Sequence, residues 1–367
     1  MKRLGVLISF SGDGGVERMV TNLCAEFASE VQADLLAIKS AGGHASRIPP
    51  TVNLIQLKAK HAWTAVPEIA RYLRDAKPDA LLVAKDRAGR AALKATRRGG
   101  SKVPVWIRLG TNLSAALERK DAFSRWLRVF PMRRIYPLAA GVVAVSQGVK
   151  DDTLRVTGLP EARVHVIRNP VITARLAEQA AEAVPHAWLA DKTLPVVIGM
   201  GRLTRQKDFP TLLRAFAALQ AQTPSRLIIL GEGKDREALT QLAAELGIGE
   251  RLLLAGFQKN PYAWLARADL FVLSSAWEGS PNALTEALAL GIPSVSTDCP
   301  SGPIEILDRG RYGPLLKIGD HAGLAAAMRQ TLAAPLPAET LKAAVDEYRA
   351  TTSARRYLEL MGLRAKA

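Results

Sequence analysis

The sequence has few cysteines and no long apolar run, and both shortages narrow the kinds of protein that it can encode. Cys24 and Cys299 are the two cysteines, and they lie far apart with neither a Cys-x-x-Cys pair nor a histidine cluster. This pattern predicts no disulfide framework and no structural zinc site, so each thiol is expected to be buried in a reducing compartment. No stretch approaches the roughly 18 apolar residues of a membrane-spanning helix.

Acidic residues are also scarce relative to basic ones. The chain has 50 Lys and Arg against 34 Asp and Glu, a formal net charge of +16. Such an excess of positive charge is typical of proteins that bind nucleic acid, an anionic membrane surface or an anionic substrate. Because no recognition motif or aromatic platform accompanies the charge, a nucleic-acid partner is not expected, although a basic nucleic-acid-binding protein remains an alternative.

A secretion signal is suggested only superficially by the amino terminus. Basic residues precede the apolar run Leu4 to Phe10, but this run is short and the Ser11 to Gly15 loop interrupts it without a cleavage site. We therefore expect the protein in the cytoplasm.

The length of 367 residues is too great for one ordinary core, so we expect two domains. Short apolar runs alternate with amphipathic segments throughout, which predicts an α/β protein with doubly wound parallel sheets. The pattern restarts after a segment rich in helix formers. The predicted division is residues 1–170, a linker 171–194, a second domain 195–345 and a carboxyl-terminal helical segment 346–367.

The chain is organised around the stretch 274–291, which follows a strand. Leu270 to Leu273 is a buried strand, and a helix follows with Ser280 as its cap, Pro281 at its first position and Gly291 just past its last turn. The loop between them lies at the carboxyl end of a parallel strand, where helix N–H groups attract anions. An ordinary capped helix with one surface glutamate is the alternative.

Two carboxylates frame this loop. Glu278 and Glu286 have seven residues between them, and Asn282 shares a helix face with Glu286, so a polar face is expected beside the loop. N–H groups for a phosphate together with carboxylates for hydroxyls suit the binding of a nucleotide sugar.

These residues carry a resemblance to a known family. The chain resembles the retaining family 4 glycosyltransferases with the GT-B fold over nearly its whole length. The motifs that carry the resemblance are the spacing of Glu278 and Glu286 and the segments 291–293 and 299–307. The resemblance implies two Rossmann-like domains facing a central cleft and a carboxyl-terminal helix that crosses back to the first domain. It also implies that Glu278 lies beside the donor sugar and that Glu286 holds the ribose hydroxyls.

A basic loop after the strand Pro195 to Gly201 supplies two cations five residues apart, Arg202 and Lys207. A forked guanidinium and a mobile ammonium suit the two phosphates of a nucleoside diphosphate. The resemblance assigns Arg202 and Lys207 to that diphosphate, and with Glu278 they are the predicted catalytic residues. The other predicted donor-binding residues are Gly14, Gly15, Phe257, Gln258, Gly279, Ser280, Pro281, Asn282 and Glu286, with Glu17 near the diphosphate.

Polar residues end two strands of the first domain, and we take them as acceptor-side candidates. They are Lys85 and Asp86 after one strand, and Arg108 and Asn112 at the end of the next. The family often has a histidine in the loop that contains Asn112, and this chain has none there. Ordinary solvated loops are the alternative.

The predicted reaction is transfer of a sugar from a nucleoside diphosphate, with uracil as the expected base, and with retention of configuration. No Asp-x-Asp motif stands at a plausible strand end, so we expect no metal, and we expect no cofactor. The acceptor is expected to be a saccharide, lipid-linked or a precursor of lipopolysaccharide, capsule or exopolysaccharide. A nucleotide-sugar epimerase of the same fold is the alternative enzyme.

An aromatic stripe lies within the basic segment Lys120 to Tyr136. Apolar residues recur there at three- and four-residue steps, namely Phe123, Trp126, Leu127 and Phe130. Such a helix either lies on an anionic membrane surface, making the protein peripheral on the inner face of the cytoplasmic membrane, or packs in the first domain's core.

Overall fold

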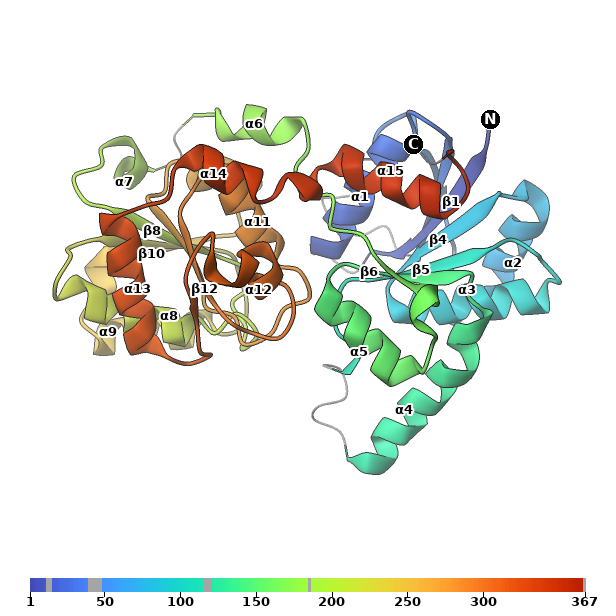
Figure 1. The fold of residues 1–367 in the computed structure, drawn as a ribbon, viewed down its shortest axis with the longest axis horizontal. Coiled ribbons are helices and arrows are strands. Elements are labelled where there is room, and N and C mark those ends of the chain that lie inside the picture. The colour runs from blue at the N-terminus through green and yellow to red at the C-terminus, as the bar shows by residue number, and fades with distance from the viewer. Residues whose placement is uncertain (11–14, 39–47, 115–120, 184–185, 366–367) are drawn as a thin grey trace. The chain divides into compact units, whose positions relative to one another are not determined.

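The computed structural model describes residues 1–10, 15–38, 48–114, 121–183 and 186–365. The chain forms two compact units (Figure 1). Unit 1 comprises Met1–Val171 and Tyr348–Ala367, and unit 2 comprises Ile172–Glu347. Residues of the predicted linker form two short helices, α6 (Arg175–Ala180) and α7 (Ala187–Ala190), within unit 2.

Unit 1 is built on a seven-stranded parallel sheet in the order β3-β2-β1-β4-β5-β6-β7. The central strands are continuous apolar runs because helices cover both faces of the sheet. The strands are β1 (Arg3–Ser9), β2 (Gln32–Ile38), β3 (Asn53–Gln56), β4 (Ala80–Ala84), β5 (Val105–Leu109), β6 (Gly141–Ala144) and β7 (Val164–Val166).

Two apolar cores lie on the two faces of this sheet. One contains residues of α2 (Val66–Ala76), α3 (Asp86–Arg98) and α5 (Gln147–Thr157), and the other contains residues of α1 (Gly15–Phe27) and α15 (Ala350–Leu360). The ribbon shows α15 lying beside α1 (Figure 1). The predicted return of the carboxyl-terminal helix to the first domain is therefore confirmed.

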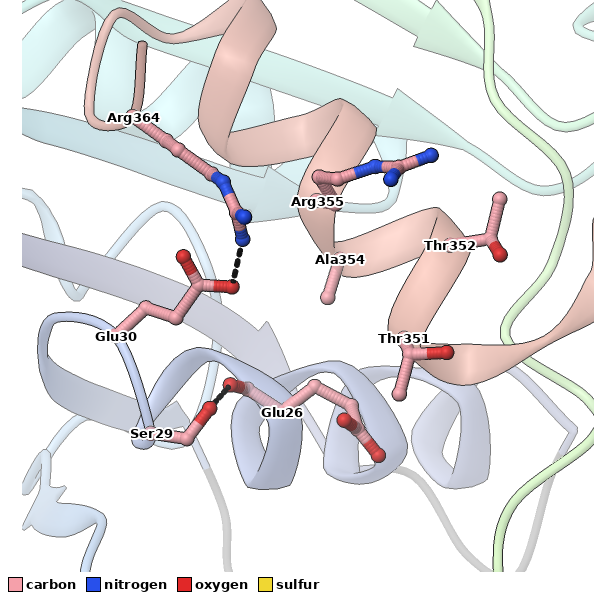
Figure 2. A pocket seen from close by; sticks show the side chains of 8 residues that line it. All are labelled: Glu26, Ser29, Glu30, Thr351, Thr352, Ala354, Arg355 and Arg364. Atoms are coloured by element: carbon pink, nitrogen blue, oxygen red, sulfur yellow. Dashed lines mark hydrogen bonds and ion pairs between the residues drawn. The ribbon is translucent and has the colours of Figure 1, made fainter. Parts of the chain in front are cut away.

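The contact between α15 and α1 combines an apolar centre with a polar margin. The rings of Phe27 and Tyr357 meet edge to face with centroids 6.2 Å apart. At the margin, Arg364 pairs with Glu30, and a groove of about 290 Å³ lies between the two helices (Figure 2). The sequence predicted one helical segment from Asp346, but a 3₁₀ turn and the extended residue Arg349 precede α15.

Unit 2 holds a six-stranded parallel sheet in the order β10-β9-β8-β11-β12-β13. Its strands are β8 (Val196–Met200), β9 (Arg226–Leu230), β10 (Leu252–Gly256), β11 (Leu270–Leu273), β12 (Ser294–Thr297) and β13 (Leu315–Leu316). Its remaining helices are α8 (Phe209–Gln220), α9 (Arg236–Glu245), α10 (Tyr262–Leu265), α11 (Asn282–Ala289), α12 (Pro303–Ile306), α13 (His321–Ala333) and α14 (Ala338–Ala343). The predicted α/β class with two doubly wound sheets is confirmed.

Each sheet has a point where the order of its strands reverses. In unit 1 this point lies between β1 and β4, and in unit 2 between β8 and β11. The helices that follow these two strands leave toward opposite faces, which opens a crevice at the carboxyl edge of the sheet where ligands bind. The loops after these four strands are therefore where a functional site is expected.

The aromatic stripe lies on α4 (Ala122–Ile135) and faces solvent. The exposed fractions are 67% for Phe123, 54% for Trp126, 51% for Leu127 and 40% for Phe130. The alternative in which this stripe fills the core of the first domain is therefore wrong, because Met132 is the only buried residue among the described side chains of the helix. Within the described residues, no helix is both long enough and apolar enough to span a bilayer.

Candidate active site

An ion pair joins the two strands at the reversal point of unit 2. Lys207, in the loop after β8, places Nζ 2.6 Å from Oε1 of Glu278, in the loop after β11. Ser275 Oγ donates a 2.7 Å hydrogen bond to the same carboxylate oxygen. The Glu278 carboxylate is nearly buried, and the ammonium is only slightly more exposed. The sequence-predicted residues Lys207 and Glu278 are thus brought together.

Backbone contacts fix the two loops against each other. Gln206 Nε2 donates to the Trp277 carbonyl at 3.0 Å, and the Ala276 N–H donates to the Gln206 carbonyl at 2.8 Å. Ser274 Oγ donates to the Lys207 carbonyl at 2.8 Å. These bonds hold the ion pair in place independently of the two charged side chains.

Two glycines let neighbouring loops approach this edge closely. A Cβ at Gly231, after β9, would lie 1.9 Å from the Gly201 carbonyl oxygen. A Cβ at Gly302, where φ is 89°, would lie 2.5 Å from Pro281 Cδ. Both distances are far below van der Waals contact, so the loops can pack this way only where no side chain is present.

Helix α11 begins one residue later than the sequence predicted. Pro281 has ψ of 101° and acts as the N-cap, so Ser280 is not the cap and Asn282 is the first helical residue. The helix ends at Ala289, and Gly291 follows with φ of 77°. With eight residues, α11 is shorter than the predicted helix from Pro281 to the residue before Gly291.

The predicted polar face of α11 is only partly open. Asn282 is half-buried, whereas Glu286 is fully buried, and the Tyr262 hydroxyl lies 3.5 Å from its Oε1. In the loop before the helix, Gly279, Ser280 and Pro281 are buried beside Gly302. The loop and the helix start therefore form a closely packed wall next to Glu278.

Three further donor candidates surround the carboxyl edge of unit 2. The Arg202 side chain is exposed, and within the described part of the chain its guanidinium has no partner. Phe257 is exposed after β10, and Gln258 Nε2 donates to the Ala255 carbonyl at 2.6 Å. An unpaired, exposed guanidinium at a strand's carboxyl end is available to an anionic ligand.

Unit 1 also has an ion pair at its reversal point. Lys85, directly after β4, places Nζ 2.6 Å from Oε1 of Glu17 in the first turn of α1, and donates to the Ser9 carbonyl at 3.0 Å. Glu17 is buried. Lys85 has φ of 77° and ψ of 143°, a conformation that is rare for any residue except glycine.

The other first-domain candidates have structural partners. The Asp86 carboxylate accepts from Tyr136 OH and from Arg90 Nη2, both at 2.9 Å. Arg108 is 1% exposed, and its Nη2 donates to Asn169 Oδ1 at 2.6 Å. Asp86 and Arg108 thus contribute to the packing of unit 1, a role that the sequence did not predict for them.

Three other predicted positions in unit 1 remain. Asn112 is half-buried in the loop after β5. Gly15 is the first residue of α1. The prediction for Gly14 falls outside the described residues.

Cys299 lies near the unit 2 ion pair. Burial raises the pKa of its thiol to about 12, and the neighbouring Glu278 charge adds to this rise. The thiol is therefore protonated at neutral pH and is no nucleophile. Among the described residues, no three His, Cys, Asp or Glu side chains are grouped so as to hold a metal ion.

Two family models match successive parts of the chain. The model described as Glycosyltransferase Family 4 matches residues 13–175, and the model described as Glycosyl transferases group 1 matches residues 181–349. Together they span nearly the whole sequence and divide near the boundary between the two units.

The chain is therefore a glycosyltransferase with a family 4-like architecture. This glycosyltransferase is similar to N-acetylgalactosamine-N,N'-diacetylbacillosaminyl-diphospho-undecaprenol 4-alpha-N-acetylgalactosaminyltransferase of Campylobacter jejuni. The two sequences are 28% identical, and the match covers 88% of this chain and 87% of the relative. Lipopolysaccharide 1,6-galactosyltransferase of Escherichia coli is 25% identical, with 92% and 91% covered.

Solved structures agree with the fold of the glycosyltransferase. The apo form of lipopolysaccharide outer core galactosyltransferase WaaB has a TM-score of 0.76 at 20% identity, with 99% of each chain covered. HepE of Anabaena, in complex with UDP, has a TM-score of 0.80 at 18% identity, with 99% of this chain and 100% of that chain covered. The predicted GT-B fold is therefore confirmed.

Sequence reasoning missed three contacts of these sites. It did not predict that Ser275 donates to Glu278, that Tyr262 lies against Glu286, or that Glu17 pairs with Lys85. Ser275 precedes Glu278 by three residues in a predicted loop, which was the available signal. The other two contacts join distant segments and depend on the order of strands.

Proposed function

We propose that this glycosyltransferase moves a sugar from a UDP-sugar to a saccharide acceptor with retention of the anomeric configuration. The observation that carries the proposal is the Lys207–Glu278 ion pair at the reversal point of the unit 2 sheet. UDP as the leaving group is supported by the solved relatives, since HepE has been obtained with UDP and with UDP-glucose.

The proposed chemistry is stabilisation of the departing diphosphate. Breaking the bond from the sugar to the phosphate leaves additional negative charge on the phosphate oxygens, and preorganised cations at that place lower the barrier. Arg202 is exposed and unpaired among the described residues, so it can receive a phosphate at no cost to an existing ion pair. Lys207 is held by Glu278 and can share its ammonium with the second phosphate.

Glu278 has a second proposed role beside the donor sugar. Its carboxylate accepts from both Lys207 and Ser275 through Oε1, which leaves Oε2 to accept from a sugar hydroxyl. The catalytic residues are thus proposed to be Glu278, Arg202 and Lys207. This arrangement needs no metal ion, since two side-chain cations supply the positive charge.

The remaining donor contacts follow from the packed wall next to Glu278. We assign the sugar and phosphates to the loop Gly279, Ser280, Pro281 and Asn282, the ribose to Glu286, and the base to Phe257 and Gln258. Glu286 is fully buried, so its contact with ribose requires the Tyr262 hydroxyl or a neighbouring side chain to give way. Gly14 and Gly15 are assigned to the diphosphate.

We propose a lipid-linked saccharide or a lipopolysaccharide or other polysaccharide precursor as the acceptor. The relatives named above support this class, since one acts on a saccharide carried by diphospho-undecaprenol and another on lipopolysaccharide. Lys85, Asp86, Arg108 and Asn112 are assigned to the acceptor side, with Asp86 and Arg108 acting through their packing contacts.

Peripheral attachment to an anionic membrane, from the cytoplasm, is part of this proposal. The four apolar side chains of α4 are exposed, and Arg134 stacks 4.6 Å from the centre of the Phe130 ring. Aromatic side chains flanked by basic ones are the composition that binds the headgroup region of anionic bilayers.

The test measures nucleotide binding and donor turnover separately. Calorimetry with UDP is compared among the wild type, Arg202→Ala, Lys207→Ala and the control Arg205→Ala, which removes a nearby exposed cation from the same loop. We expect the first two variants to lose at least about tenfold in affinity, as for charge-assisted hydrogen bonds, and the control to bind normally. Equal affinity in all four proteins would refute the diphosphate assignment, and a panel of nucleotide sugars assayed for diphosphate release identifies the donor.

A further inference from the structure

The two units carry equivalent ion pairs at equivalent places. In unit 2 the lysine follows the first of the two strands at the reversal point and the glutamate follows the second. In unit 1 the arrangement is exchanged, since Glu17 follows β1 and Lys85 follows β4. Both pairs have an N–O distance of 2.6 Å. Because open parallel sheets bind ligands in the crevice at this position, the charged pair of unit 1 also lies where a ligand is expected.

The backbone of Lys85 is held in an unfavourable conformation. Its φ of 77° and ψ of 143° belong to a region that glycine alone occupies readily, although the residue has a long side chain. The conformation is fixed because the Lys85 N–H donates to the Arg108 carbonyl at 3.1 Å and its carbonyl accepts from the Gly89 N–H at 3.0 Å. A glycine would relieve the strain, whereas the lysine places an ammonium group at this edge at the cost of that strain.

A second positive charge lies beneath the same edge. Arg108 is 1% exposed, and among the described residues its Nε and Nη1 have no hydrogen-bond partner. A Cβ at Gly110 would lie 3.6 Å from Arg108 Nη1 and 3.5 Å from Val16 Cγ2, so the guanidinium extends toward the first turn of α1. Within the described part of the chain, this buried guanidinium pairs with a neutral amide, Asn169, and no carboxylate compensates its charge.

The charges of unit 1 favour an anion at this crevice. Among the described residues at this edge, Glu17 offsets Lys85 and Asp86 is held by Arg90 and Tyr136, so Arg108 carries the excess charge there. The amino terminus of α1 adds partial positive charge at the same place. The excess extends to the whole unit, because unit 1 contains all of the chain's positive surplus while acidic residues slightly outnumber basic ones in unit 2.

We propose that this crevice binds an anionic group of the acceptor, a phosphate ester or a sugar carboxylate, through the ammonium of Lys85. The inference rests on the proposed transferase function and specifies the acceptor of that reaction. Glu17 is a positioning residue that holds and neutralises Lys85 until the anion arrives. Arg108 supplies background positive charge from below, without touching the anion.

The test uses three probes of equal chain length: n-octyl glucoside, its 6-phosphate ester and n-octyl glucuronide. Thermal unfolding is recorded with each probe for the wild type, Lys85→Asn, Glu17→Gln, Lys207→Met and the control Lys94→Gln, an exposed lysine of α3. Asparagine carries a Cβ as lysine does, so Lys85→Asn removes the charge without adding to the strain that this backbone already bears. The phosphate and carboxylate probes distinguish the two sources of the anion.

We expect one of the two anionic probes, and not the neutral one, to raise the unfolding temperature of the wild type, Lys207→Met and Lys94→Gln. Lys85→Asn should lose the effect, with affinity reduced about 10- to 100-fold. Glu17→Gln should bind the anion more tightly, because its amide oxygen still accepts from Lys85 but no longer neutralises it. If the Glu17–Lys85 pair were merely structural, Lys85→Asn and Glu17→Gln would both bind the anionic probe more weakly.

Two results would overturn the inference: no stabilisation of the wild type by either anionic probe, or full stabilisation of Lys85→Asn. Failure of the proposed transferase function is recognised separately, since it shows as an absence of UDP binding in the wild type. As a further check, Lys85→Gly should raise the unfolding temperature by relieving the backbone strain while abolishing the response to the anion.

Discussion

The ammonium of Lys207 lies 2.6 Å from the carboxylate of Glu278, although 71 residues separate the two along the chain. The pairing follows from the sheet order, in which β8 and β11 are neighbours and their loops open at the same edge. Ser275 donates to the same oxygen and Gln206 fastens the backbones of both loops, so the pair is preorganised before any ligand binds.

Replacing Glu278 by glutamine should separate binding from chemistry. The amide still accepts from Lys207 but carries no charge, so UDP affinity should be retained or increased, while transfer falls roughly 100-fold or more because a preorganised charge is lost. Calorimetry and a diphosphate-release assay measure the two quantities. Glu237→Gln, an exposed change on α9, is the control. Parallel losses of affinity and rate would instead make Glu278 a binding residue.

Transfer should persist in a chelating buffer. Arg202 and Lys207 provide the two positive charges that a divalent ion would otherwise supply to the diphosphate. The rate of diphosphate release is compared before and after dialysis against EDTA. A loss of activity that magnesium or manganese restores would contradict the prediction.

The wild type should float with anionic vesicles at low salt and separate from them at high salt. Exposed aromatic residues insert at the headgroup level, and each nearby cation contributes about 1 kcal/mol that salt screens. Trp126→Ser and Phe130→Ser should weaken flotation several-fold. Trp63→Ser is the matched control, since Trp63 is also exposed but lies outside α4. If all three variants float like the wild type, α4 is not the membrane-binding element.

Gly302→Ala should destabilise unit 2 and weaken nucleotide binding. The new Cβ would meet Pro281 Cδ at 2.5 Å and occupy a backbone with φ of 89°, for a combined cost of about 2–4 kcal/mol. Gly319→Ala measures the cost of the backbone conformation without the steric clash, because Gly319 has φ of 79° and open space around its Cβ position. Urea unfolding should show a cost of about 1 kcal/mol for the control.

Protonation of His165 should lower the stability of unit 1 as the pH drops below neutral. Burial lowers the pKa of His165 from its ordinary value of 6.5, and the nearby Lys150 charge lowers it further. The unfolded chain therefore takes up a proton first, so this stabilisation is present above pH 6.5 and is lost as the pH falls through the folded-state pKa. His165→Gln should reduce the slope of urea midpoint against pH between about 7 and 5. An unchanged slope would assign the effect to other groups.

The strands were the part of the fold that the sequence predicted most closely. The boundaries of β11 match the predicted ones, because the strand is an unbroken apolar run with polar residues at both ends. The start of α11 was misplaced by one residue, because proline fits both the cap and the first helical position and only its ψ distinguishes them.

The sites were predicted as sets of residues rather than as contacts. Arg202, Lys207 and Glu278 could be named because each follows an apolar run, but the Lys207–Glu278 pairing depends on strand order, which local patterns do not encode. The burial of Arg108 was missed for a related reason, since its partner Asn169 comes from a segment 61 residues away. Periodicity alone also could not tell whether the α4 stripe faces solvent or core.

Unit 2 is inserted within unit 1, since the chain leaves unit 1 at Val171 and returns at Tyr348, where the Val171 N–H donates to the Tyr348 carbonyl at 3.0 Å. Synthesis on the ribosome therefore delivers all of unit 2 before the residues that complete unit 1. Until α15 emerges, the apolar face of α1 that receives Tyr357 and Leu358 lacks its cover. The nascent first unit therefore leaves this apolar face uncovered throughout the synthesis of unit 2, until Tyr348–Ala367 has emerged.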